Sequence, residues 1–102
     1  MPAYVVNEIT IIDVERYREY AESMPATLTP FGGVFLARGR PVPMAGETPS
    51  ERIVILQFPD AGHAWRWRDS QSYQALLLIR NASSTSRVYV IDADNIGHFV
   101  IR

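Results

Sequence analysis

The chain has 102 residues, 47% of them hydrophobic, and a formal net charge of −1 at pH 7. This length suits a single domain over residues 1–102 with a real core, and the charge argues against a nucleic-acid partner. No apolar run approaches the roughly 18 residues that a membrane span needs. The first residues, Met1-Pro2-Ala3, lead into apolar chain without a basic region or cleavage site, so we expect a cytoplasmic protein without a membrane partner.

Two residue types are absent. The chain has no cysteine, and all ten of its basic residues are arginine. Disulfides, thiolate nucleophiles, Schiff-base lysines and phosphate-loop lysines are therefore excluded. The two histidines, His63 and His98, have no carboxylate at a metal-ligand spacing, and no phosphate loop or dinucleotide fingerprint is present. We expect no metal ion and no cofactor.

The first elements are a strand and a helix. Residues 3–12 are rich in β-branched side chains and predict a strand. Asp13 is a good N-cap for a helix, in which Arg18 and Glu22 have the spacing of an ion pair. Pro25 predicts an end near Ser23 and a further helical turn. The apolar stripe of this helix consists of Val14, Tyr17, Ala21, Met24 and Leu28.

Residues 30–58 predict a turn and two strands. Pro30-Phe-Gly-Gly33 has turn chemistry, and Val34 to Arg38 predicts the second strand. The Pro- and Gly-rich segment 39–50 is long for a hairpin connection and is typical of a lid or binding loop. The third strand, centred on residues 53–56, is an unbroken apolar run, which is typical of a strand covered on both faces.

The rest of the chain predicts helix followed by strand. A helix is expected from Asp60 to Asp69, and Ser70 caps another. Residues 81–86 predict a polar loop and residues 87–92 a fourth strand. The apolar residues 96–101 predict a fifth. The second of these helices places Tyr73, Leu76, Leu77 and Arg80 on one face.

This order, β-α-β-β-α-β with an appended C-terminal strand, is the ferredoxin-like α+β arrangement. The first and third strands are the most apolar, and in this fold these two strands lie in the centre of the sheet. Helices cover one face of the sheet, so the other face needs cover from elsewhere. We therefore expect a homodimer with the two sheets face to face, and the 96–101 tail reaching toward the partner.

Several segments resemble the domain-of-unknown-function 1330 family, in the same order over about residues 2 to 92. They are Asp13-Val-Glu-Arg-Tyr-Arg-Glu-Tyr-Ala21, Pro25-Ala-Thr-Leu28, Gly32-Gly-Val-Phe-Leu-Ala-Arg-Gly39, Glu51-Arg-Ile-Val-Ile-Leu-Gln-Phe-Pro59, Trp67-Arg-Asp-Ser70, Tyr73-Gln-Ala-Leu76 and Arg80. The chain departs from the family pattern at Ala45-Gly46, where members often have Glu-Gly, and it extends past the usual end from Asp94.

The resemblance implies a dimeric α+β barrel, in the superfamily that includes antibiotic-biosynthesis monooxygenases. From it we expect a small-molecule-binding homodimer that acts as a cofactor-independent enzyme on an aromatic or polyketide-like substrate. The reaction type, whether monooxygenase, isomerase or cyclase, stays open. A non-catalytic binding or interaction module is the alternative. A weaker one is a tautomerase that uses Pro2 as a base, because Met1 to Asn7 is similar to the start of that superfamily.

The site is expected between the sheet and the helices, closed by the 39–50 loop. Tyr17 and Tyr73 project from inward helical stripes, and Asn7 is polar within a central strand, where an unpaired amide costs about 1–3 kcal/mol. Arg38 could bind a carboxylate or phenolate, Trp67 could stack on an aromatic ligand, and His63 could transfer a proton at the cleft mouth. We therefore assign catalytic roles to His63, Tyr17 and Arg38, and ligand binding to Asn7, Trp67 and Tyr73. Arg52 is expected to pair with a surface carboxylate, and His98 to be an interface histidine.

Overall fold

The fold is that of a computed structural model, which describes residues 1–93. The elements are β1 (Ala3–Ile11), α1 (Val14–Leu28), the short 3₁₀ helix η1 (Thr29–Phe31), β2 (Val34–Gly39), β3 (Arg52–Phe58), α2 (Ala61–Asp69), α3 (Gln71–Ser83) and β4 (Ser84–Asp92). The ferredoxin-like α+β fold expected from the sequence is confirmed, with the second helical segment divided into α2 and α3.

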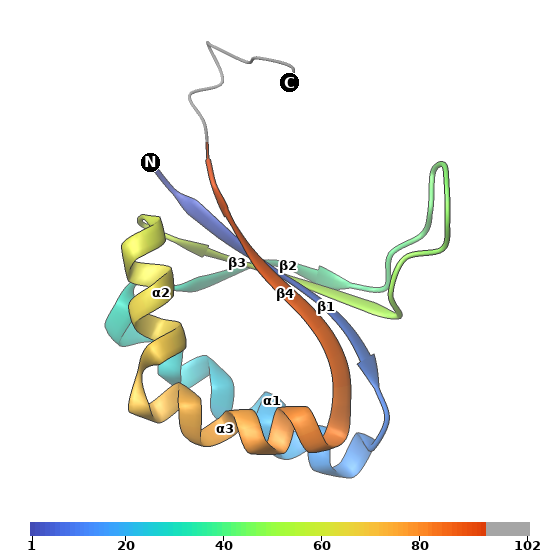
Figure 1. Cartoon of the computed structure of the whole chain (residues 1–102), viewed down its shortest axis with the longest axis horizontal. Coiled ribbons are helices and arrows are strands. Elements are labelled where there is room, and N and C mark those ends of the chain that lie inside the picture. Colours follow the sequence, from blue (N-terminus) through green and yellow to red (C-terminus); the bar gives the residue numbers. More distant parts are fainter. Residues whose placement is uncertain (94–102) are drawn as a thin grey trace.

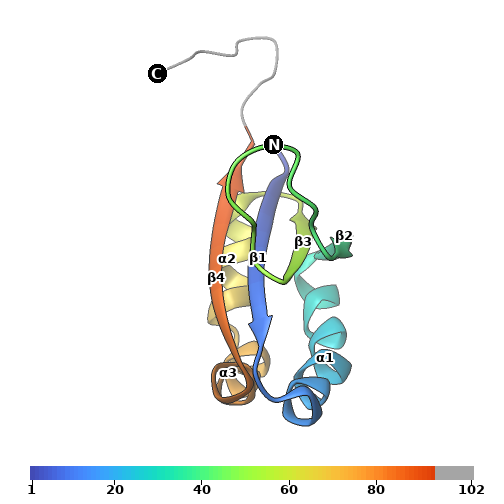
Figure 2. The same ribbon diagram turned by 90° about the vertical axis from the view of Figure 1, so that its right-hand side faces the viewer.

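The four strands form one sheet in the order β2-β3-β1-β4, in which every neighbouring pair is antiparallel. The two central strands are β1 and β3, as their apolar sequences predict. Figures 1 and 2 show the helices gathered against one side of the curved sheet, while the loop between β2 and β3 projects away from the body.

Alternate residues of the central strands point to opposite faces of the sheet. The side chains that face the helices are buried, and they are Ala3, Val5, Asn7 and Ile9 of β1 and Val54, Leu56 and Phe58 of β3. The intervening residues are half-buried, namely Tyr4, Val6 and Glu8 of β1 and Ile53, Ile55 and Gln57 of β3. We call this second side the open face, because no described helix packs on it.

Helix α1 begins as predicted and ends differently. Asp13 caps it, and its carboxylate accepts a hydrogen bond from the backbone N–H of Arg16 at 3.2 Å. The predicted break near Ser23 is wrong, because α1 continues through Pro25 to Leu28. Pro25 itself is exposed. The last turn of the helix is anchored in the core by three buried side chains near it, those of Met24, Thr27 and Leu28.

Two further sequence predictions about local structure are wrong. Arg18 pairs with Glu15 at 3.1 Å instead of Glu22. The polar loop expected over residues 81–86 does not form, because α3 runs to Ser83 and β4 starts at Ser84. Here the polar side chains satisfy helix-end carbonyls: the Ser83 hydroxyl donates to the Ile79 oxygen at 2.6 Å and the Ser84 hydroxyl to the Arg80 oxygen at 2.7 Å.

The strand expected over residues 96–101 and the interface role expected for His98 lie outside the described residues. Within residues 1–93, none of the helices has both the length and the apolar character needed to cross a membrane.

Candidate functional site

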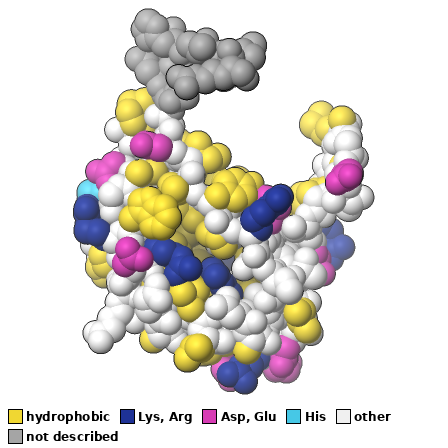
Figure 3. Space-filling view, viewed as in Figure 1, with side chains coloured by type: hydrophobic (Ala, Val, Ile, Leu, Met, Phe, Trp, Pro, Cys, Tyr) yellow, Lys and Arg dark blue, Asp and Glu magenta, His cyan; other side chains and the backbone are white. Residues whose placement is uncertain are grey.

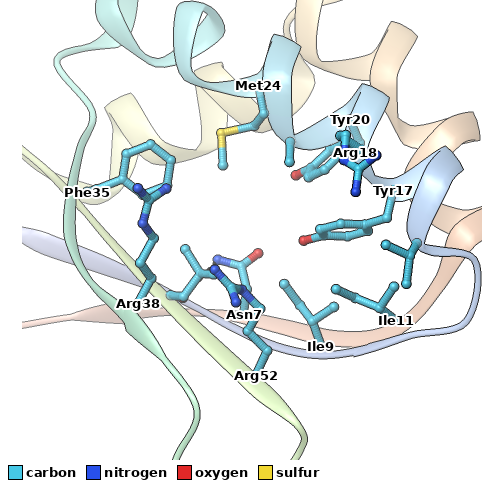
Figure 4. A pocket seen from close by; sticks show the side chains of 13 residues that line it. Asn7, Ile9, Ile11, Tyr17, Arg18, Tyr20, Met24, Phe35, Arg38 and Arg52 are labelled. Atoms are coloured by element: carbon cyan, nitrogen blue, oxygen red, sulfur yellow. Dashed lines mark hydrogen bonds between the residues drawn. The ribbon is translucent and has the colours of Figure 1, made fainter.

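A cavity of about 250 Å³ lies between α1 and the helix-facing side of β1, β2 and β3. Most of its wall is apolar, and the apolar lining residues are Ile9, Ile11, Val14, Ala21, Met24, Phe35 and Val54. Figure 4 shows these walls enclosing a space into which side chains from α1 and the sheet project from opposite sides. The size and the lining of this cavity suit a small, partly apolar molecule.

The mouth of the cavity is positively charged. Three exposed arginines line it, Arg18, Arg38 and Arg52, and no aspartate or glutamate is among its described lining residues. Arg18 is already paired with Glu15, whereas Arg38 and Arg52 form no ion pair with any of residues 1–93. The expected pairing of Arg52 with a surface carboxylate is therefore not found among the described residues. The Arg38 guanidinium lies 5.1 Å from the centre of the Phe35 ring, which holds it against the wall.

The floor of the cavity carries three buried polar side chains, Asn7, Tyr17 and Tyr20. Asn7 donates from Nδ2 to the backbone oxygen of Val54 at 3.2 Å, which fixes the amide on the sheet. The two tyrosines project from successive turns of α1, with ring centres 5.4 Å apart. Their hydroxyl groups point into the cavity, across from Asn7 and Arg38 (Figure 4).

Burial raises the pKa of the Tyr17 hydroxyl, and more strongly that of Tyr20. Both side chains are therefore neutral hydrogen-bond donors near neutral pH and are unsuited to act as bases.

Behind Tyr20 lies a chain of buried polar groups. The hydroxyls of Tyr20 and Tyr73 are 2.8 Å apart, and Nη1 of Arg80 donates to the Tyr73 oxygen at 3.1 Å. Tyr73 is fully buried and Arg80 is 6% exposed. No carboxylate of residues 1–93 pairs with Arg80, and its Nε has no hydrogen-bond partner there. A guanidinium is thus buried close to the cavity without a counter-charge.

The six residues assigned from the sequence occupy different places. Asn7, Tyr17 and Arg38 line the cavity together. Tyr73 lies one layer behind, in contact with Tyr20. Trp67 is 1% exposed, and its Nε1 donates to the Thr27 hydroxyl at 2.9 Å, so the core holds it away from this cavity.

His63 lies apart from the cavity, in the first turn of α2. Its Nδ1 is 2.7 Å from Oδ1 of Asp60, the residue that caps this helix. The hydrogen bonds from the His63 ring and backbone lower the pKa of the Asp60 carboxyl. This arrangement stabilises a helix start, and nothing in it brings the imidazole to the cavity mouth. Pro2 also lies outside the cavity lining, and its carbonyl accepts a hydrogen bond from the Ala93 N–H at 3.2 Å.

A second cavity of about 200 Å³ opens between α2 and the edge of the sheet at β4. Trp67 forms part of its wall together with Trp65, which is 55% exposed, and Tyr89. Figure 3 shows hydrophobic side chains gathered on this side of the molecule, with arginines beside them. Trp67 is buried and Trp65 is exposed, because two residues that are two positions apart on a helix cannot both face the core.

Several features of the site differ from the sequence expectations. Tyr20 and Arg80 were not assigned to it, although two signals were present. Tyr20 is three residues after Tyr17 and so shares its face, and Arg80 is a charged residue on an otherwise apolar helical face. The 39–50 loop does not close the cavity. Strand β2 continues to Gly39, paired with Ile53, and carries the loop beyond the end of the sheet (Figure 1).

Within the described residues, no group of three His, Cys, Asp or Glu side chains could hold a metal ion. The chemistry of the cavity is instead that of two unpaired guanidinium groups, two phenolic donors and one carboxamide. Such a set binds and stabilises anionic or carbonyl oxygens.

The model of a family described as a domain of unknown function, DUF1330, matches residues 2–94 of the chain. The chain belongs to the DUF1330 family. The resemblance drawn from the sequence motifs is thereby confirmed. Among curated proteins, no match was found.

Solved structures resemble this member of the DUF1330 family in fold. A protein of unknown function from Rhodopseudomonas palustris is 16% identical with a TM-score of 0.75, and the match covers 92% of this chain and 83% of that one. SnoaB, a cofactor-independent oxygenase from Streptomyces nogalater, is 15% identical with a TM-score of 0.66, covering 92% and 94%. A dabb family protein with a ferredoxin-like fold from Mesorhizobium loti is 13% identical with a TM-score of 0.64, covering 92% and 96%.

Proposed function

We propose that this DUF1330 protein is a small-molecule-binding homodimer that acts, without a cofactor, on an aromatic or polyketide-like substrate bound in the cavity below α1. The observation that carries this proposal is the lining of that cavity. Arg38 and Arg52 at the mouth, and neutral hydroxyl donors at the floor, face an apolar space without any carboxylate from the described lining residues. An acidic aromatic molecule matches this distribution of charge.

The same lining limits the chemistry. Tyr17 and Tyr20 remain protonated, and His63 lies elsewhere, so no described lining side chain is suited to take a proton from carbon at neutral pH. The site instead stabilises an anion that the substrate forms by its own acidity. Phenols and β-dicarbonyl compounds, which are frequent in polyketide-like molecules, form enolates or phenolates readily. This type of substrate fits oxygenation by O₂, isomerisation or cyclisation through the stabilised anion. SnoaB, which shares the fold, is a cofactor-independent oxygenase.

The missing base also favours a second candidate, a binding module that holds such an anion without converting it. Turnover separates the two candidates, because both need the same cavity.

The homodimer is supported by the open face of the sheet. Half-buried Val6, Ile53 and Ile55 lie there beside exposed Val34 and Ile91. A matching open face on a second copy would remove these apolar side chains from water, worth roughly 25 cal/mol per Å².

A ligand screen tests the proposal. Thermal shift is measured with aromatic acids, phenols and quinones, for example salicylate, 4-nitrophenol and 1,4-naphthoquinone, followed by crystal soaks of the compounds that raise Tm. We expect a stabilising acid or phenol seated against Tyr17 and Arg38. Incubation of that compound with protein and O₂, followed by mass analysis, then distinguishes enzyme from binding module. A ligand that lies between the open faces of two subunits would contradict the choice of cavity.

A further inference from the structure

A buried chain of hydrogen bonds links Arg80, Tyr73 and Tyr20. The number of protons on these three side chains determines which group donates to which. A guanidinium only donates, so Arg80 Nη1 donates to the Tyr73 oxygen. Each phenol has a single proton, and the contact between the Tyr20 and Tyr73 hydroxyls at 2.8 Å uses one of the two.

Two directions are available for that contact. If Tyr20 donated to Tyr73, the proton of the fully buried Tyr73 hydroxyl would have no acceptor among residues 1–93. Buried donors without a partner are rare in protein interiors. If Tyr73 donates to Tyr20, the Tyr73 proton is used, and of the two hydroxyl protons only that of Tyr20 is left. The sequence of donors is then Arg80 to Tyr73 to Tyr20.

Tyr20 lines the cavity, and its hydroxyl points into it (Figure 4). With its oxygen accepting from Tyr73, its own proton is left for an acceptor inside the cavity. A cationic first donor polarises the hydroxyls that follow and strengthens the last hydrogen bond. Tyr17, whose hydroxyl has no hydrogen-bond partner among residues 1–93, points into the same space from the next turn of α1.

We infer that Tyr20 is the deep oxygen-binding group of the cavity, which donates to a carbonyl, enolate or phenolate oxygen of the ligand, and that Arg80 acts through Tyr73 as the positioning residue that fixes Tyr20 as a donor. This inference rests on the proposed function and makes its substrate class more specific. The ligand has an oxygen at its inner end, separate from any acidic group held by Arg38 at the mouth.

The buried charge of Arg80 supports this role. An isolated guanidinium is costly to bury, and here no described carboxylate offsets it. An anionic oxygen bound by Tyr20 would lie at the end of the same hydrogen-bond chain and supply the missing negative charge. Arg52 and Arg80 both act in this sense on Tyr17, and the described lining of the cavity contains no aspartate or glutamate that would oppose them.

The test uses 4-nitrophenol as a probe, because its absorption reports whether the bound form is phenol or phenolate. Bound to the wild-type protein, 4-nitrophenol should titrate at lower pH than in water. Tyr20→Phe should weaken binding of the phenolate at least about tenfold and reverse most of that shift, since hydrogen bonds to charged groups are the strong ones. Nitrobenzene, which has the same ring and no ionisable oxygen, should bind equally to both proteins. Tyr4→Phe removes one hydroxyl on the open face and serves as the matched control.

The role of Arg80 is tested with Arg80→Met, Tyr73→Phe and Arg80→Lys, each checked for a folded circular dichroism spectrum. The first two should lose most of the shift of the nitrophenol titration while keeping nitrobenzene affinity, and Arg80→Lys, which still donates, should restore part of it. If Arg80→Met does not fold, the role of Arg80 is judged from the other two variants: the nitrophenol titration should shift less in Tyr73→Phe than in Arg80→Lys.

Wild-type affinity and titration retained in Tyr20→Phe would overturn the inference and leave the proposed function standing. Binding of nitrobenzene without any binding of nitrophenolate would overturn the inference together with the anionic ligand class of the proposed function. Failure of the wild-type protein to bind either compound, or any member of the screening panel, would overturn both.

Discussion

The side-chain Nδ2 of Asn7 donates to the backbone oxygen of Val54 at 3.2 Å, between the two central strands of the sheet. The two residues are also direct partners in the β1–β3 ladder. This bond fixes the orientation of the amide, whose oxygen has no hydrogen-bond partner among residues 1–93. The sheet thus holds a buried amide whose oxygen is left without a partner beside a cavity. Such a group is better suited to bind a ligand than to stabilise the fold.

Asn7→Leu should therefore weaken ligand binding while leaving the stability of the fold almost unchanged. The change replaces a buried amide with an apolar side chain of similar size, so we expect the free energy of unfolding in urea to change by less than about 1 kcal/mol. Binding of salicylate or 4-nitrophenol should weaken about three- to tenfold because one neutral hydrogen bond is lost. Urea titration and isothermal calorimetry measure the two effects. Asn81→Leu, on the exposed end of α3, is the control, and equal binding by the two variants would remove Asn7 from the site.

The two unpaired arginines at the mouth give a second prediction. Arg38→Met and Arg52→Met should each weaken binding of an aromatic carboxylate about tenfold or more and leave the affinity for nitrobenzene unchanged. The affinity of the wild-type protein for the carboxylate should also fall with added salt, because these guanidinium groups are exposed. Calorimetry at low and high salt checks both statements. Arg16→Met, on the outer side of α1, should behave as wild type; a loss as large as that in the mouth variants would point to a general effect of net charge.

The order of the elements could be predicted from the sequence because each depends on local signals. The capping residues Asp13, Asp60 and Ser70 mark the three helix starts, and the unbroken apolar run of β3 marks a central strand. The errors arise where tertiary packing overrides a local rule. Pro25 should end a helix, yet the last turn of α1 is held by buried neighbours, and the serines at positions 83 and 84 favour a loop until their hydroxyls satisfy helix-end carbonyls.

The candidate site was harder to predict than the fold. Helical periodicity correctly turns Tyr17 inward, but it does not say how deeply a side chain is buried, so it also predicts Tyr73 and Trp67 at the cavity, which neither of them lines. Arg52 illustrates a second limit. Whether a residue at the start of a strand pairs on the surface or faces a cavity depends on the helix that packs opposite, and the sequence of the strand does not contain that information.

Glu8 gives a prediction about pH. Hydrogen bonds from Arg87 at 2.8 Å and Tyr89 at 2.7 Å lower the pKa of its carboxyl below the usual value of about 4.5. A carboxyl with a lowered folded-state pKa stabilises the fold fully above its unfolded pKa, and this contribution is lost as the pH falls through the folded value. Glu8→Gln should therefore destabilise the protein at pH 7 and have a smaller effect near pH 3. Urea unfolding at both pH values measures this, with Glu22→Gln on α1 as control, and a difference that stays constant with pH would rule out the pairing.

The last prediction concerns the open face of the sheet. Ile55 lies at its centre, paired in the ladders with Val6 on one side and Ala37 on the other. If a second copy covers this face, Ile55→Asp places a carboxylate in an apolar interface and should convert the dimer to a monomer at micromolar concentration. The helix-facing core is untouched by the change, so the far-ultraviolet circular dichroism spectrum should stay that of the wild type. Light scattering coupled to size exclusion gives the mass. Leu78→Asp, at an apolar side chain that is 77% exposed on α3, introduces the same charge away from the sheet and should leave the dimer intact. A monomeric mass for the wild-type protein would show that the open face has another partner or none.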